Sequence, residues 1–144
     1  MDKQGFTLLE TVAITMLSGL MLCSISLGTQ YTEQIAFTTF VRQVENGIKS
    51  AQYMANLTGK GYNVYCASRA IYIRQGINKA IYKFALSKHV SLSYDTTFKQ
   101  MNFLGKLGPT QGGSIVLVDT RLAKKARITI RVATGKTTVY YEKL

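Results

Sequence analysis

A single carboxylate, that of Glu10, interrupts an apolar run that extends from Phe6 to Leu27. A charged side chain inside a membrane-spanning helix costs about 2.5–3.5 kcal/mol at the bilayer centre on insertion scales. Such a carboxylate needs a cationic partner, a position near the membrane interface, or both. A plain signal-anchor helix that tolerates one glutamate near its end is the simpler interpretation, and periodicity alone does not distinguish the two.

The other polar residues do not form a catalytic or metal-binding pattern. His89 is the only histidine, and Asp95 and Asp119 stand apart from other acids. No group of His, Cys, Asp and Glu has the spacing of metal ligands. The glycine-rich segment 108–113 lacks the Gly-Lys-Ser/Thr ending of a phosphate-binding loop. We therefore expect neither an enzyme nor a cofactor.

The two cysteines predict no disulfide framework. Cys23 lies inside the apolar run, whereas Cys66 lies far outside it. If the helix is straight, their Cα atoms are much too far apart for an intrachain disulfide. We expect both to be small apolar side chains.

The chain beyond Leu27 is strongly basic. It contains 17 of the 18 Lys and Arg residues and five of the acids, so its net charge is +12. Such a surface attracts DNA, wall polymers or anionic lipid. Basic and aromatic residues interleave at 72–74, 79–83 and 121–127. The last segment supplies four candidate DNA contacts, which are Arg121, Lys124, Lys125 and Arg127. A solvated strand face with a charged loop is the simpler interpretation, and we favour it.

The apolar run has the length of about 20 residues that crosses a bilayer. A secretory signal peptide has a shorter apolar region and a small-x-small cleavage site, and no such site follows this run. A lipoprotein signal would use Cys23, but Leu22 stands where such signals need a small residue. We therefore expect residues 6–27 to form a transmembrane helix.

The order Gly5-Phe6-Thr7-Leu8-Leu9-Glu10 resembles the class III signal of type IV pilins and pseudopilins. The resemblance implies that residues 1–5 are a leader, that a membrane prepilin peptidase cuts between Gly5 and Phe6, and that Phe6 is then N-methylated. It also implies that Glu10 pairs with the terminal ammonium of a neighbouring subunit. Electrostatics agrees with this role, because cleavage creates a cation four residues from Glu10 and opposite charges attract strongly in lipid.

The residues after Leu27 predict more helix and then only strands. Apolar residues recur in steps of three and four up to Ala55, and Glu45 and Lys49 form an i,i+4 pair on the other side. Residues 28–57 are therefore predicted to be an amphipathic continuation of the helix. Gly59 and Gly61 are expected to end it. Alternation predicts strands at 70–74, 80–86, 89–94, 100–104, 114–119, 126–132 and 137–142, the last two joined by a hairpin at 133–136. In the third of these, Val90, Leu92 and Tyr94 should face the core. The pattern predicts an α+β fold, with the helix packed across an antiparallel sheet formed within residues 58–144.

This organisation also resembles the type IV pilin fold. The loop 107–113, the strand after it and the C-terminal ARITIRVATGKTTVYYEKL are similar to the ComGD-type competence pseudopilins of Gram-positive bacteria, and more distantly to GspH-type minor pseudopilins of type II secretion. The resemblance implies a minor pseudopilin of the cell membrane, with a cytoplasmic N-terminus, that joins other pilins at the cell surface. A separate assembly ATPase would drive the filament, which serves uptake of external DNA in transformation. A secretion-system pseudopilin and a membrane-tethered DNA-binding receptor remain alternatives.

Overall fold

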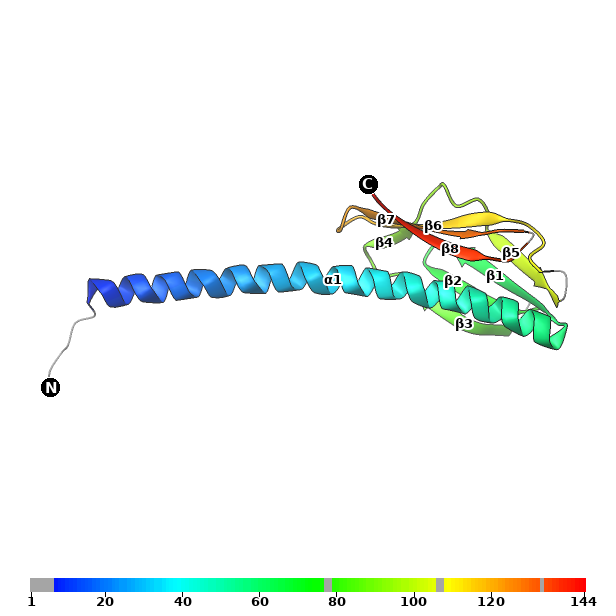
Figure 1. The fold of residues 1–144 in the computed structure, drawn as a ribbon, viewed down its shortest axis with the longest axis horizontal. Helices are drawn as coiled ribbons and strands as arrows, with labels where there is room; N and C mark the ends of the chain where they lie inside the picture. Colours follow the sequence, from blue (N-terminus) through cyan, green and yellow to red (C-terminus); the bar gives the residue numbers. More distant parts are fainter. Residues whose placement is uncertain (1–6, 77–78, 106–107, 133) are drawn as a thin grey trace. The chain divides into compact units, whose positions relative to one another are not determined.

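The computed structural model describes residues 7–76, 79–105, 108–132 and 134–144. Within these residues the chain is an α+β protein with one long helix followed by strands (Figure 1). The elements are α1 (Leu8–Thr58), β1 (Gly61–Ala67), β2 (Ala70–Gln75), β3 (Lys79–Ala85), β4 (Val90–Leu92), β5 (Gln100–Leu104), β6 (Gly113–Asp119), β7 (Lys124–Ile130) and β8 (Thr137–Lys143). The chain divides into two compact units, Met1–Ala36 and Phe37–Leu144, and we call the second unit the head.

Local capping sets both ends of α1. At the start, the backbone N–H of Glu10 faces the Thr7 hydroxyl oxygen at 3.4 Å, in the Thr-x-x-Glu pattern of a capping box. At the other end, Gly59 has a φ of +66° and its N–H donates to the carbonyl of Ala55 at 2.9 Å. A glycine in this left-handed conformation is a common helix C-cap. The first of the two predicted glycines thus ends the helix, whereas Gly61 begins β1.

The head part of α1, Phe37–Thr58, buries one apolar stripe. Its buried apolar residues recur in steps of three and four: Phe37, Val41, Val44, Ile48, Ala51 and Ala55. They form one core with side chains of the strands. At Gly47 the helix lies close to its neighbours, because a Cβ there would lie 2.7 Å from Cζ of Phe84 and 2.8 Å from Cδ1 of Ile73. The predicted pair is confirmed on the exposed side, where Lys49 Nζ lies 2.7 Å from Glu45 Oε1.

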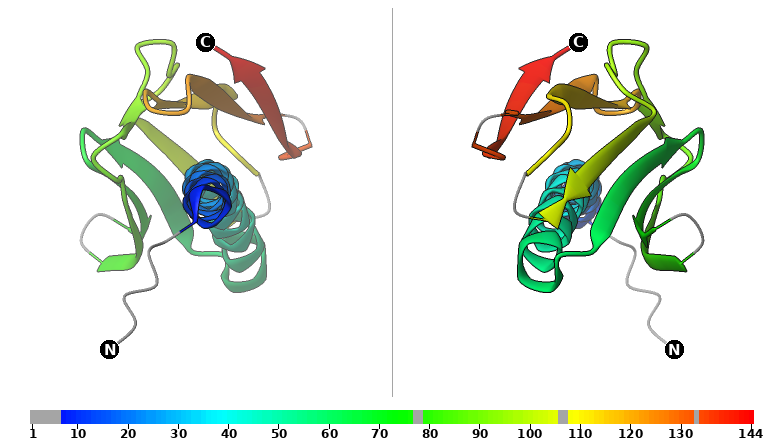
Figure 2. Two further views of the ribbon diagram at one scale, coloured as in Figure 1. Left: turned by 90° about the vertical axis from the view of Figure 1, so that its left-hand side faces the viewer. Right: turned by 90° about the vertical axis from the view of Figure 1, so that its right-hand side faces the viewer.

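The strands form two antiparallel sheets, and the prediction of a single sheet is wrong. Sheet A has the strand order β3-β2-β1-β5, and sheet B has the order β4-β6-β7-β8. Figure 2 shows sheet A beside the head part of α1 and sheet B above it. The division arises because β5 pairs back with β1, whereas β6 pairs with β4 and β7. These pairings join residues far apart in the chain, so local alternation does not reveal them.

No strand is predicted for residues 61–67, yet β1 is a central strand of sheet A. It pairs with β2 on one side and with β5 on the other. Tyr62, Val64 and Cys66 are buried at the alternating positions expected of a strand. Asn63, which lies between them, is a polar residue that is only 8% exposed. Its Nδ2 donates to the carbonyl of Gly76 at 2.6 Å, which satisfies the buried amide.

The remaining strands lie at or near their predicted positions, except that β4 is shorter than the predicted 89–94. Val90 is buried and Leu92 is half-buried, as expected, but Tyr94 is fully exposed and its predicted core position is wrong. The reason is a turn in which the N–H of Thr96 donates to the carbonyl of Ser93 at 3.1 Å. This turn takes Tyr94 out of the regular alternation along the strand.

Candidate functional site

The segment Leu8–Ile25 of α1 is long and apolar enough to cross a membrane, and none of it is buried. Large apolar side chains are exposed along its whole length; Leu9 is 81% exposed, Leu17 60% and Leu22 69%. A helix that is apolar all round is stable where lipid or other apolar surfaces cover it. The segment is therefore a candidate membrane and assembly site.

Hydroxyl side chains in this segment are bonded to its own backbone. The hydroxyl of Thr11 donates to the carbonyl of Leu8 at 2.8 Å, and that of Ser18 donates to the carbonyl of Thr15 at 2.9 Å. Ser24 donates in the same way to Leu20 at 2.9 Å. Polar groups in lipid must be satisfied within the protein, so these hydroxyls do not prevent burial in an apolar phase.

Glu10 lies in the first turn of α1. Its backbone N–H donates to the Thr7 carbonyl at 3.0 Å, and this turn carries the positive partial charge of the helix dipole. Glu10 thus occupies the third position of a capping pattern, where a negative charge is favourable, besides the predicted role in pairing with a terminal ammonium. Gly5 and Phe6, the predicted cleavage and N-methylation sites, lie outside the described residues.

Two of the four predicted DNA contacts lie beside acids. Lys125 Nζ donates to Asp95 Oδ2 at 2.6 Å, and Arg127 Nε lies 4.0 Å from Glu142 Oε1. The hydrogen bond and charge of Lys125 lower the pKa of the Asp95 carboxyl below its ordinary value. These acids reduce the positive potential that a phosphate would meet at this face of β7.

The other two predicted contacts lie in the turn after β6 and at the start of β7. Arg121 lies in the turn after β6, where Asp119 Oδ1 accepts hydrogen bonds from the N–H groups of Arg121 and Leu122 at 2.9 and 3.1 Å. Lys124 lines a pocket of about 240 Å³ between the head part of α1 and β8. Lys124 alternates with Lys125 along β7, so these two predicted residues lie on opposite faces of the strand.

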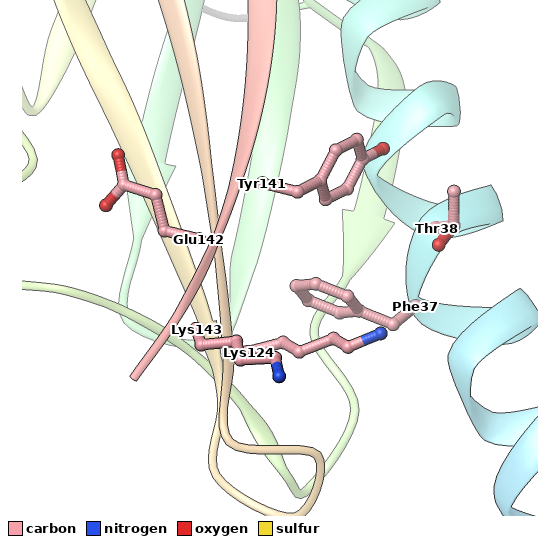
Figure 3. A pocket seen from close by; sticks show the side chains of 6 residues that line it. All are labelled: Phe37, Thr38, Lys124, Tyr141, Glu142 and Lys143. Atoms are coloured by element: carbon pink, nitrogen blue, oxygen red, sulfur yellow. The ribbon is translucent and has the colours of Figure 1, made fainter.

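The pocket beside Lys124 is an aromatic slot. Phe37 and Tyr141 point into the space between α1 and β8, whereas Glu142 points away from the helix (Figure 3). Burial raises the pKa of the Tyr141 hydroxyl. The residues that line the slot are Phe37, Thr38, Lys124, Tyr141, Glu142 and Lys143. This mixture can hold an apolar group near positive charge, but it contains no acid–base pair arranged for catalysis.

Sheet A brings together a second cluster of aromatic and basic side chains. Tyr65, Tyr72 and Lys83 are cross-strand neighbours on β1, β2 and β3. Arg74 Cζ lies 4.6 Å from the ring centroid of Tyr65 and 5.2 Å from that of Tyr72, and Lys83 Nζ lies 5.9 Å from the latter. The cations occupy ring faces that bases would otherwise stack on, so the cluster stabilises itself.

The single histidine and the cysteines form no site together. His89 is exposed, and the described residues contain no group of three or more side chains that could hold a metal ion. Cys23 and Cys66 are both free. Cys23 is exposed, whereas burial raises the pKa of the Cys66 thiol to about 12, which keeps it protonated and unreactive.

The fold and the candidate site define an α+β protein with one helix that could span a membrane. Comparison with protein-family models, curated proteins and solved structures finds no match. The resemblance to pilins therefore depends on the residues themselves, above all on the order from Gly5 to Glu10 and the apolar helix after it.

Proposed function

We propose that this chain is a minor pseudopilin, a structural subunit that joins a membrane-anchored filament through α1. One observation carries the proposal: an apolar helix exposed on all sides follows the residues Gly5-Phe6-Thr7 and has Glu10 in its first turn. The order of these residues resembles the type IV pilin signal. The observed order, one helix followed by antiparallel sheets, is compatible with a pilin-like fold. The pilin-like fold itself is part of the proposal.

The filament we propose is a ComGD-type competence pseudopilus that serves uptake of external DNA. The chain spans the cell membrane once, with its N-terminus in the cytoplasm, and reaches the surface on assembly with other pilins. A separate ATPase supplies the work, and this chain has no enzymatic activity or cofactor of its own. A minor pseudopilin of a type II secretion-like system would use the same segment and is the alternative.

The role of Glu10 in this proposal is electrostatic. After cleavage, Phe6 carries an ammonium group, and in lipid its attraction to a neighbouring carboxylate is far stronger than in water. A carboxylate that is costly to bury alone is stabilised when two subunits meet. The membrane-tethered DNA receptor gains no support from Lys125 and Arg127, because both lie beside acids.

Mass spectrometry of the N-terminus tests the proposal most directly. In cells that contain prepilin peptidase, the mature chain should begin at Phe6 and carry a methyl group on its amine. In matched cells without the peptidase, the same chain should retain residues 1–5. A chain that still begins at Met1 or Asp2 in peptidase-containing cells would contradict the proposal.

Two variants separate the charge of Glu10 from its capping role. Glu10→Gln keeps a capping-box residue but removes the charge, whereas Thr7→Ala removes the cap and keeps the charge. We expect Glu10→Gln to insert into the membrane normally but to lower filament incorporation, measured by crosslinking to other pilins. Thr7→Ala should incorporate nearly as wild type. The reverse result would assign Glu10 to helix capping alone.

A further inference from the structure

A second pocket of the head, of about 520 Å³, lies where two turns meet β4. Ser68 and Arg69 come from the turn between β1 and β2, and Ser87 and Lys88 come from the connection between β3 and β4. Leu86, Val90 and Ser91 complete the lining. The residues that line this pocket thus include three serines, one arginine and one lysine.

Backbone hydrogen bonds hold these segments together. The N–H of Leu86 donates to the carbonyl of Arg69 at 3.0 Å, which ties the two turns to each other. The N–H of Val90 donates to the carbonyl of Ser87 at 3.1 Å, which closes the turn that carries Lys88. The backbone positions of Arg69 and Lys88 are therefore fixed before a ligand binds, and this reduces the entropy cost of binding.

Among the residues that the structure describes, neither Arg69 nor Lys88 has an ion-pair partner, and the hydroxyls of Ser68, Ser87 and Ser91 have no hydrogen-bond partner. This contrasts with Lys125 and Arg127, which lie beside acids.

The nearest acid by strand pairing does not cancel the positive charge of the pocket. Asp119 lies opposite Val90 on β6, but it is 7% exposed and does not line the pocket. Its Oδ1 already accepts two backbone hydrogen bonds from Arg121 and Leu122.

We infer that this pocket binds a phosphate group that carries an organic substituent. Arginine offers paired N–H donors that match phosphate oxygens, lysine adds a point charge, and serine hydroxyls donate to the remaining oxygens. Leu86 and Val90 form an apolar wall for the substituent, and the volume exceeds what a bare phosphate needs. The phosphate can belong to a phosphodiester chain or to a small molecule. The inference does not depend on filament assembly.

The test uses the full chain in detergent micelles at about 0.15 M salt, where long-range attraction is screened. Inorganic phosphate and a thymidine dinucleotide, which has one phosphodiester, are titrated separately while amide NMR shifts are followed. We expect the largest shifts at Ser68, Arg69, Ser87 and Lys88. A response to the dinucleotide supports binding of a substituted phosphate, whereas a response to inorganic phosphate alone would overturn the assignment of an organic substituent.

Matched variants separate the pocket from the general positive charge of the head. Arg69→Gln and Lys88→Gln should each weaken binding about tenfold or more, and Ser87→Ala about fivefold. Lys60→Gln removes the same charge at an exposed position away from the pocket and should change binding by less than about twofold. An unchanged unfolding midpoint shows that each variant is folded. The inference is overturned if neither probe shifts the pocket amides, or if Lys60→Gln weakens binding as much as Arg69→Gln does.

Discussion

The two parts of α1 cover their apolar side chains in different ways. In Phe37–Thr58 the apolar residues follow one stripe and are buried by strands of the same chain; Ile48, for example, is 0% exposed. In Leu8–Ile25 they occur all round the helix and none is buried, and Ile35 farther along is still 55% exposed. The comparison teaches that one stretch is stabilised within the molecule, whereas the other needs a lipid or protein partner. Variants in the two parts should therefore affect different measurements.

The largest expected effect is on head stability when Ile48 is truncated. Ile48→Ala should lower the free energy of unfolding by about 2–5 kcal/mol, because it leaves a cavity in a closely packed core. Ile35→Ala makes the same chemical change at an exposed position and should cost less than about 0.5 kcal/mol. Urea unfolding followed by tyrosine fluorescence measures both, since the chain has nine tyrosines and no tryptophan. Equal losses of unfolding free energy in the two variants would contradict the conclusion that only the head part of α1 is stabilised by burial within the chain.

The complementary change places a charge in the apolar segment. Leu17→Arg should make membrane insertion less favourable by about 3 kcal/mol and lower the fraction of chain that resists alkaline extraction from membranes. The same variant should leave the unfolding midpoint of the head unchanged, because Leu17 lies outside the head and is 60% exposed. Leu17→Met is the apolar control. Full membrane retention of Leu17→Arg would argue against a spanning role.

A smaller effect is expected from filling the close contact at Gly47. Alanine favours helix over glycine by about 1 kcal/mol, but the new Cβ would clash with Phe84 and Ile73. Gly47→Ala should therefore destabilise the head by about 1–3 kcal/mol in the same urea experiment. Gly28→Ala is the matched control, because a Cβ there meets nothing within 4 Å. A stabilised Gly47→Ala variant would show that α1 does not pack this closely on sheet A.

The smallest expected effect concerns the exposed pair between Asp95 and Lys125. Lys125 lowers the pKa of Asp95 below 3.8, so the pair contributes stability above that pH and loses it as pH falls through the lowered value. Asp95→Asn should be slightly less stable than wild type near neutral pH, and the difference should vanish in strong acid. Lys125→Gln should show the same loss near neutral pH. A difference that persists at low pH would point to a cause other than this ion pair.

Much of the secondary structure can be predicted from residue patterns. The length of α1, its apolar stripe and its end at Gly59 follow from local spacing and from a glycine that adopts a positive φ. Most strands also appear where alternation predicts them. The exceptions are β1, which is not predicted, and Tyr94, which a turn takes out of the sheet pattern.

The order of residues from Gly5 to Glu10 and the apolar pattern after them by themselves predict a membrane helix and suggest a pilin-like subunit, because covalent neighbours and helical periodicity are local properties. Only the tertiary structure decides that the strands form two sheets, that Lys125 and Arg127 lie beside acids, and that Arg69 and Lys88 line one pocket. The physical reason is that strand pairing and ion pairing join residues distant in the chain. Each such contact is selected by the packing of the whole head, which no short stretch of sequence encodes.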